Sequence, residues 1–379
     1  MSCFKMGTKI YSGNNATENL KAVQCQRVLV ICDPFMVQSG MVKNVTAVLD
    51  EMKVPYQIFA EIVPDPTIEV VTKGVAYAAH CQPDMIVALG GGSALDTAKA
   101  VRQIYRQGVE DMAVQLVCIP TTSGTGSEVT SFAVISDPSV NGKYALVDDA
   151  MIPDIAILDP VFTLTVPQNV TADTGIDVLT HTLEAYVSTD ATDFTDACAE
   201  KAMRIIWQDL AKVVADGENQ LLREKIHNAS CLAGMAFSEA SLGICHSLAH
   251  ALGGRFHIPH GRANAILLPH VIAFNAGLET SQDTQALTKY AAAANILGLQ
   301  SMTERTTVNL LIAGIQKLTR KMNIPKFVTE LGIDEEEFIA AIPEMAAAAL
   351  KDKCTVTNPR KATAEDLAKI YARICRGGY

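Results

Sequence analysis

Residues 85–99 read MIVALGGGSALDTAK, and this stretch decides the fold. The run at 85–89 is continuously apolar, which is typical of a strand buried on both faces, and it passes through three glycines into a segment with helical spacing. Similar short apolar runs alternate with helical segments along the first half of the chain. This alternation predicts a Rossmann-like α/β domain with a parallel sheet crossed by helices. The runs expected to form strands are 28–32, 56–62, 85–89 and 114–119, with weaker candidates at 132–136, 143–147 and 155–158.

Beyond Val166 the sequence changes in character, because β-branched runs give way to alanine- and leucine-rich segments of helical length. These segments are separated by Gly, Pro and Asn, which end helices. We therefore predict two domains, an α/β domain over residues 1–166 and an all-α domain over residues 167–379. The helices expected in the second domain cover 174–186, 196–214, 220–240, 284–294, 306–322, 335–347 and 364–376.

The charge of the chain excludes several classes of partner. Its 379 residues carry 31 Lys and Arg against 41 Asp and Glu, a formal net charge of −10. Binding to nucleic acid or to an anionic membrane requires a concentrated positive field on the protein. Because the average field of this chain is negative, we expect neither as a partner. The ten cysteines form no C-x-x-C pair, which favours free thiols in a reducing compartment. No apolar run reaches the roughly 18 residues that a membrane span needs, and we expect a cytoplasmic protein.

The glycines at 90–92 predict a phosphate site. A buried strand, a glycine run and a helix together place backbone N–H groups at a helix N-terminus, where their partial positive charge favours a phosphate. The loop does not match G-x-G-x-x-G, because Leu95 stands three positions after Gly92. The alternative is a tight strand-to-helix turn with Ser93 as the N-cap.

A second loop, PTTSGTGSE at 120–128, follows the strand expected at 114–119. Parallel strands end at one edge of their sheet, so the two loops together favour a ligand with a diphosphate. Asp33 ends the first strand and is a candidate for binding a ribose 2′-hydroxyl. The alternative reading of Asp33 is an ordinary turn before Pro34.

Three other polar residues are expected to have no catalytic role. Lys99 and Glu128 lie behind the two loops, and we predict that they are solvated or helix-stabilising charges. His227 has no histidine neighbour at ligand spacing, so we predict a surface or core histidine.

Histidines and one aspartate in the second half predict a metal site. Asp177 and His181 are four residues apart and share one face of a helix, and His246 and His250 repeat that spacing. His260 follows after two glycines. Three imidazoles and one carboxylate suit Fe²⁺ or Zn²⁺. The alternative is a pair of polar surface contacts, but an apolar surrounding sequence favours a metal, because buried polar groups need partners.

These residues resemble the iron-containing (group III) alcohol dehydrogenases over nearly the whole chain. The motifs that carry the resemblance are GGGSALDTAK (90–99), PTTSGTGSEVT (120–130), TGIDVLTHTLEAYVS (174–188), CHSLAHALGGRFHIPHGRANAILLPHV (245–271) and TNPR (357–360). The glycine-loop segment, with Ala94 and Leu95, resembles most the 1-propanol dehydrogenase branch. The resemblance implies that the first domain binds a dinucleotide and that the second binds the metal and is catalytic.

The resemblance also implies a role for individual residues. His250 is expected to be a proton relay rather than a ligand. The implied metal ligands are Asp177, His181, His246 and His260. The implied cofactor contacts are Asp33, Gly91, Gly92, Ser93, Thr121, Thr122, Ser123, Thr130, Lys143 and Thr163. The implied substrate pocket contains Phe132, Phe237, Leu242 and Cys354.

The expected activity is a reversible hydride transfer between NAD(H) and a short-chain aliphatic alcohol or aldehyde, for example propanal and 1-propanol. NAD(H) is preferred over NADP(H), because the Asp33 carboxylate repels a 2′-phosphate. The expected metal is Fe²⁺, with Zn²⁺ as the alternative, and the expected assembly is a homodimer or higher homo-oligomer. A bacterial microcompartment is a second expected location within the cytoplasm. The alternatives are a lactaldehyde/1,2-propanediol or 1,3-propanediol oxidoreductase of the same family and, in a different class, a metallohydrolase acting on a phosphorylated substrate.

Overall fold

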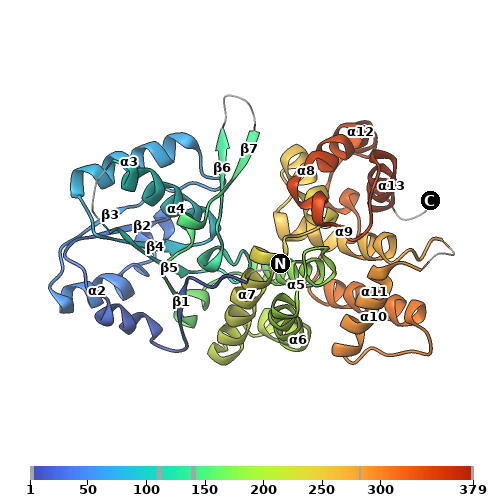
Figure 1. The fold of residues 1–379 in the computed structure, drawn as a ribbon, viewed down its shortest axis with the longest axis horizontal. Helices are drawn as coiled ribbons and strands as arrows, with labels where there is room; N and C mark the ends of the chain where they lie inside the picture. Colours follow the sequence, from blue (N-terminus) through green and yellow to red (C-terminus); the bar gives the residue numbers. More distant parts are fainter. Residues whose placement is uncertain (1–3, 109–112, 138–141, 281–282, 377–379) are drawn as a thin grey trace. The chain divides into compact units, whose positions relative to one another are not determined.

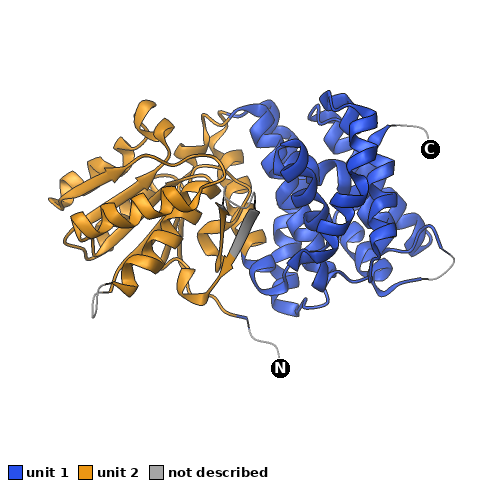
Figure 2. Ribbon diagram, turned by 90° about the horizontal axis from the view of Figure 1, so that it is seen from above, with its two compact units in different colours: residues 1–4, 167–217, 235–379 blue, residues 5–166, 218–234 orange. Residues whose placement is uncertain are grey.

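The computed structural model describes residues 4–108, 113–137, 142–280 and 283–376. The chain folds into two compact units, which Figure 2 distinguishes by colour. One, the sheet unit, comprises residues 5–166 and 218–234. The other, the helical unit, comprises residues 1–4, 167–217 and 235–379.

The sheet unit contains a six-stranded parallel sheet, as the alternating pattern predicted. Its order is β1-β8-β5-β4-β2-β3. The short edge strand β1 was not among the predicted strands, because its half-exposed residues lack a continuous apolar run. The strands are β1 (Lys9–Ser12), β2 (Val28–Cys32), β3 (Tyr56–Phe59), β4 (Met85–Gly90), β5 (Gln115–Pro120) and β8 (Ile155–Leu158).

Helices cover both faces of this sheet, and Figure 1 shows α2 on one side and α3 and α4 on the other. Side chains along a strand alternate between faces, so β2 supplies Val30 to one apolar core and Ile31 to the other. Burial on both faces explains why β2 and β4 consist of apolar residues. The helices of this unit are α1 (Pro34–Gln38), α2 (Lys43–Met52), α3 (Ile68–Cys81) and α4 (Gly92–Gln107), with 3-10 helices η1 (Ala16–Ala22), η2 (Ser127–Val129), η3 (Asp149–Met151) and η4 (Pro160–Thr163).

Two of the three weaker candidate strands form a separate hairpin, while the third, at 155–158, is β8 of the parallel sheet. β6 (Phe132–Asp137) and β7 (Gly142–Val147) pair antiparallel, with Phe132 opposite Val147. Val134 and Val147 are exposed, which separates this hairpin from the buried strands of the parallel sheet.

The described part of the helical unit contains α-helices and 3-10 helices, as predicted. Helix α5 is buried along most of its length, and neighbouring helices approach it closely at glycines. A Cβ at Gly261 would lie 2.0 Å from the carbonyl oxygen of Asp173 on α5, so only glycine allows this approach. No described helix is long and apolar enough to cross a membrane. Helix α7 (Gln220–Ala240) begins in the sheet unit and ends in the helical unit. The other helices of the helical unit are α5 (Gln168–Val187), α6 (Asp193–Ala215), α8 (Ile244–Phe256), α9 (His260–Asn275), α10 (Gln285–Ile296), α11 (Glu304–Lys321), η5 (Val328–Leu331), α12 (Glu335–Lys351), η6 (Lys353–Thr357) and α13 (Ala364–Cys375).

Candidate functional site

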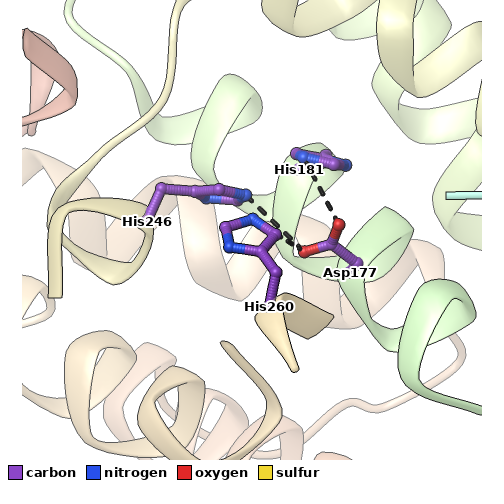
Figure 3. A group of neighbouring side chains, drawn as sticks. All are labelled: Asp177, His181, His246 and His260. Atoms are coloured by element: carbon purple, nitrogen blue, oxygen red, sulfur yellow. Dashed lines mark ion pairs between the residues drawn. The ribbon is translucent and has the colours of Figure 1, made fainter. Parts of the chain in front are cut away.

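Four side chains from three helices of the helical unit converge on one point (Figure 3). Helix α5 supplies Asp177 and His181, one turn apart, while α8 supplies His246 and α9 supplies His260. One ligand atom from each of the four lies within 4.8 Å of the others. Asp177, His181 and His246 are buried, whereas the side chain of His260 is 41% exposed. The structure thus brings together the four residues that the family resemblance named.

The distances within this group suit a shared metal ion. The Asp177 carboxylate lies 3.9 Å from His181 Nε2, 3.7 Å from His246 Nε2 and 3.5 Å from His260 Nε2. These distances are at or beyond the limit of a hydrogen bond. They are close to the roughly 3.4 Å that separates two ligands placed about 2.1 Å from one tetrahedral ion.

His246 is held in the form that binds metals. Its Nδ1 lies 2.5 Å from Glu184 Oε2, and the other oxygen of Glu184 accepts a hydrogen bond of 2.7 Å from the Cys245 N–H. A carboxylate at this position accepts a hydrogen bond from Nδ1–H, which keeps the ring proton on Nδ1 and leaves a lone pair on Nε2. That Nε2 is buried and has no hydrogen-bond partner among the described residues. Since a buried polar atom without a partner is costly, an ion in the middle of the group fits these residues.

Burial favours neutral imidazoles and neutral acids in this group. It lowers the pKa of His181 to about 3 and the pKa of His246 well below its ordinary value. It raises the pKa of Asp177, and it raises the pKa of Glu184 to about 7. Neutral imidazole is the metal-binding form, and a bound cation would restore the charged form of both carboxylates.

Asn264 supports two members of the group and was not predicted. Its amide nitrogen donates a 2.7 Å hydrogen bond to Asp177 Oδ1 and lies 3.2 Å from His260 Nε2. Asn264 stands one turn after His260 on α9 and is fully buried. This spacing is the signal that points to it, although an asparagine in an apolar helix is not by itself a ligand pattern.

His250 lies beside the four-residue group. Its ring stacks on the ring of His260 with 5.3 Å between centroids, and its Nδ1 lies 2.9 Å from Asp352 Oδ2. Its side chain is 45% exposed. Asp352 therefore fixes one ring nitrogen and leaves the other for exchange of a proton.

The predicted pocket residues lie in both units. In the helical unit, the Phe237 ring stacks on His181 with 4.5 Å between centroids, and Cys354 is grouped with His250 and Asp352. Leu242 is buried, and its carbonyl oxygen accepts a 2.7 Å hydrogen bond from Thr357. Phe132 belongs to the sheet unit and begins β6.

Two loops meet at the carboxyl edge of the parallel sheet. Strands β4 and β5 are neighbours, so the loops that follow them touch, and a Cβ at Gly92 would lie 2.9 Å from the Thr125 side chain. The chain crosses from β3 to β4 over β2, which reverses its progress across the sheet. Open α/β sheets bind ligands outside the carboxyl ends of the strands at such a point. The alternative reading of the glycine loop placed Ser93 at the N-cap, and this detail is wrong, since Gly91 caps α4.

Asp33 ends β2 at this same edge and caps the helix that follows, which agrees with the reading as a turn before Pro34. Its Oδ1 accepts a 3.2 Å hydrogen bond from the Met36 N–H and so caps α1. Its Oδ2 faces the glycine loop, because a Cβ at Gly90 would lie 3.0 Å from it. Burial raises the pKa of Asp33.

The other predicted cofactor residues differ in their surroundings. Thr121 is buried and Thr122 is half-buried in the loop after β5, where the Ser123 hydroxyl meets a histidine. Thr163 is buried, and its hydroxyl donates to the Pro160 carbonyl oxygen at 2.8 Å. Lys143 belongs to β7, but its side chain lies outside the described part of the structure.

Lys99 and Glu128, which were predicted to be solvated or helix-stabilising charges, are both buried, so the solvated alternative is wrong. The Lys99 ammonium donates to Thr130 Oγ1 at 3.1 Å and to the Phe132 carbonyl oxygen at 2.8 Å. Asp96, one turn earlier on α4, accepts from Ser127 Oγ at 2.6 Å and from the Val134 N–H at 2.9 Å. Together they fix the segment from 127 to 134, which carries two predicted site residues.

His227 is buried, which agrees with a core histidine, but it also holds a predicted cofactor residue. Its Nδ1 lies 2.9 Å from the Ser123 hydroxyl. The first half of α7 reaches this loop because Gly126 and Gly234 pack together: a Cβ at Gly126 would lie 2.6 Å from the Gly234 Cα. The contact joins residues more than 100 positions apart, and no local pattern reveals it.

Comparison with known proteins gives consistent matches. Residues 7–160 match the model of iron-containing alcohol dehydrogenase, and residues 171–375 match the C-terminal model of the Fe-containing alcohol dehydrogenase family. A 1-propanol dehydrogenase PduQ of Citrobacter freundii is 46% identical over 99% of this chain and 100% of its own length. The crystal structure of a 1,3-propanediol oxidoreductase superposes with a TM-score of 0.90 at 33% identity over 99% of this chain and 100% of its own. The structure of a sulfoacetaldehyde reductase from Bifidobacterium kashiwanohense in complex with NAD+ gives 0.88 at 25% identity, covering 100% of both chains.

Proposed function

This chain belongs to the iron-containing alcohol dehydrogenase family, and from that membership we propose that it interconverts propanal and 1-propanol with NAD(H). The observation that carries the proposal is the convergence of Asp177 and three imidazoles, with the buried Nε2 of His246 left without a hydrogen-bond partner among the described residues. The identity of 46% to a 1-propanol dehydrogenase supports the substrate. The match to the family disfavours a metallohydrolase, which would need no nicotinamide.

We propose Asp177, His181, His246 and His260 as the ligands of one Fe²⁺, with Zn²⁺ as the alternative ion. When bound, such an ion polarises the substrate oxygen, and the nicotinamide supplies or accepts the hydride. Glu184 and Asn264 orient this ligand set, because Glu184 holds the His246 ring and Asn264 holds the Asp177 carboxylate. Phe237 packs against His181 and narrows the space for a substrate, which favours a short aliphatic chain.

The proposed cofactor residues are the predicted set at the carboxyl edge of the sheet unit and around it. Residues 1–166 would thus bind the dinucleotide, while residues 167–379 would supply the metal and catalytic residues. Backbone N–H groups at the start of α4 suit the diphosphate, and the Asp33 carboxylate suits a ribose 2′-hydroxyl. A similar solved structure in complex with NAD+ supports a nicotinamide dinucleotide. Because Asp33 would repel a 2′-phosphate, replacing it by serine should raise kcat/KM for NADPH relative to NADH.

His250 is proposed to exchange the proton of the alcohol with solvent. Asp352 holds its Nδ1, and the half-exposed ring leaves Nε2 for this exchange. His250→Ala should lower turnover across the pH profile. Wild-type turnover at every pH would refute the relay.

A substrate panel tests the proposed reaction. Iron-loaded protein should oxidise NADH faster with propanal than with lactaldehyde or 3-hydroxypropanal. With propanal as the substrate, it should oxidise NADH faster than NADPH. The second candidate is a lactaldehyde/1,2-propanediol or 1,3-propanediol oxidoreductase, which the similarity to a solved 1,3-propanediol oxidoreductase favours. A higher kcat/KM for either hydroxyaldehyde would select it.

We also propose that the protein is a homodimer or higher homo-oligomer in the cytoplasm, with a bacterial microcompartment as the second location. Light scattering of the purified chain tests the assembly, and fractionation of the producing cells tests the location.

A further inference from the structure

A second group of metal-ligating side chains lies in the helical unit, outside the proposed ligands of the iron centre. It consists of His250 on α8, Asp352 after α12 and Cys354 in η6, and one donor atom of each lies within 4.8 Å of the others. His250 has a proposed role in proton exchange, but that role uses neither the carboxylate nor the thiol as a ligand. Imidazole, carboxylate and thiolate are all ligands of Zn²⁺.

The chain holds this group in place before any ion binds. His250 Nδ1 lies 2.9 Å from Asp352 Oδ2, and Asp352 Oδ1 accepts a 2.8 Å hydrogen bond from the Cys354 N–H. The hydroxyl of Thr355, the next residue, donates to the Ala349 carbonyl oxygen at 2.7 Å, and its oxygen lies 2.8 Å from Ser247 Oγ. These bonds fold the end of α12 back on α8, so little conformational entropy remains to be lost on binding.

The charges of the group also suit a divalent cation. Burial opposes the charged form of Asp352, but hydrogen bonds from His250 and Cys354 outweigh it and lower the pKa of Asp352 to about 2. Burial and the Asp352 carboxylate raise the pKa of Cys354 well above its ordinary value. The thiol is therefore protonated without a metal, and an ion that binds it must displace that proton.

We propose that His250, Asp352 and Cys354 form an accessory site for a thiophilic divalent cation, with Zn²⁺ the preferred ion and water as the fourth ligand. A tetrahedral Zn²⁺ holds nitrogen and oxygen ligands about 3.4 Å apart, so the His250 and Asp352 atoms need to separate by only about 0.5 Å. The Zn–S bond replaces the S–H bond, and the proton passes to solvent with no change in oxidation state. The half-exposed His250 ring gives the ion access from solvent.

Occupation of this site has a consequence that rests on the proposed function. With Zn²⁺ on His250 Nδ1, the ring proton lies on Nε2 and leaves no lone pair there to accept the proton of the alcohol. Zn²⁺ should therefore inhibit the iron-loaded enzyme without replacing its iron. The proposed iron ligands contain no sulfur, which makes the thiolate a spectroscopic marker of the accessory site alone.

Cobalt titration tests the site independently of activity. Metal-free protein titrated with Co²⁺ should bind a second equivalent, with a thiolate-to-cobalt charge-transfer band in the near ultraviolet. Cys354→Ser should lose this band and the second equivalent, while Cys198→Ser, which removes a partly exposed thiol outside both groups, should keep them. Absence of the band in the wild type, or its persistence in Cys354→Ser, would overturn the proposal.

Zinc inhibition tests the consequence. Each variant is compared with its own zinc-free rate, and bound iron is measured before and after zinc is added. The wild type should lose most of its turnover with its iron retained. Cys354→Ser should need at least about tenfold more Zn²⁺ for the same inhibition, because it lacks one strong ligand. Equal inhibition of both proteins with loss of iron would overturn the regulatory consequence. A cobalt band without zinc inhibition would uphold the site and refute the role of His250.

Discussion

Two proposed sites are built in different ways: the metal centre of the helical unit (Asp177, His181, His246 and His260) and the cofactor edge of the sheet unit (Asp33 and the loops at 90–93 and 120–128). At the metal centre, side-chain atoms of Asp177 and three histidines point at one another from well-formed helices. At the cofactor edge, glycines and hydroxyls form a surface of backbone groups, and buried charges behind that surface hold its shape. The function of the first region depends on the identity of its ligand atoms, whereas the function of the second depends on the position of its backbone.

This difference predicts how the two regions respond to substitution. Removing a ligand deletes part of the chemistry, because no neighbouring residue supplies the same atom. Removing a support such as His227 leaves every backbone N–H present but shifts a loop by a small distance. Substitutions at the metal centre should therefore reduce turnover, and those behind the cofactor edge should change cofactor KM and stability.

Asp177→Ala should have the largest effect. Loss of the one carboxylate among the proposed ligands should lower kcat at least about 1000-fold, since Lewis-acid assistance contributes about 4 kcal/mol to transition-state stabilisation. Steady-state NADH oxidation and the iron content per chain measure it. Asp173→Asn, one turn earlier on α5 and paired with Arg262 at 2.9 Å, is the matched control and should keep its iron. Equal losses of turnover and iron in both variants would mean that any substitution on this part of α5 disrupts the site, and would contradict a specific role for Asp177.

His227 should make the sheet unit sensitive to acid. Burial lowers its pKa to about 4, whereas an unfolded histidine titrates near 6.5, so the unfolded chain takes up this proton first as the pH falls. Its contribution to stability is complete above about pH 6.5 and is lost towards pH 4, by up to about 3 kcal/mol. His227→Asn should flatten the decline in unfolding free energy over this range. His80→Asn, at an exposed position on α3, should not, and a decline of unchanged steepness in His227→Asn would contradict the prediction.

Glu184→Gln should weaken the metal centre without removing a ligand. Glutamine has the same shape but a weaker acceptor for the His246 ring proton, and substitutions of this kind lower metal affinity about 10- to 100-fold. Competition with a chelator measures the affinity. Glu200→Gln, which changes a carboxylate bonded to the Tyr186 hydroxyl, is the control. Wild-type affinity in Glu184→Gln would show that the Glu184–His246 contact does not tune the ligand.

Ser123→Ala should have the smallest effect and should separate the two regions most clearly. The hydroxyl makes one hydrogen bond to His227, and the loss of about 1 kcal/mol should raise the KM for NADH about fivefold. Iron content should not change. A fall in iron content with an unchanged KM for NADH would show that Ser123 supports the metal centre, and would contradict the distinction between the two regions.

The sequence predicts the metal centre better than the supports of the cofactor edge. Asp177 and His181 lie one turn apart on one helix, and histidine spacing is visible without a structure. The burial of Lys99 could not be predicted, because its partners Thr130 and Phe132 lie on the far side of a turn more than 30 residues away. The contact of His227 with Ser123 spans still more of the chain. Local sequence patterns predict which side chains share one face of a helix. They do not predict which distant carbonyl or hydroxyl group will form a hydrogen bond with those side chains.

The same limit applies to the fold. The buried strands β2, β4 and β5 are evident from their apolar runs, and the helices are evident from their spacing and caps. Strand β1 is half-exposed and pairs on one side only, so its four residues carry no comparable pattern. Ser93 suits an N-cap by residue type, yet the close packing of Gly92 on the Thr125 side chain selects a turn in which Gly91 takes that position.

In the proposed function, one ion held by Asp177, His181, His246 and His260 makes this chain an alcohol dehydrogenase. Metal is therefore removed with a chelator, Fe²⁺ is restored in stoichiometric amounts, and NADH oxidation with propanal is recorded at each step. We expect no turnover in the metal-free protein and full recovery when one iron per chain is bound, with no recovery in Asp177→Ala. Turnover by the metal-free protein, or equal recovery by Asp177→Ala, would contradict it.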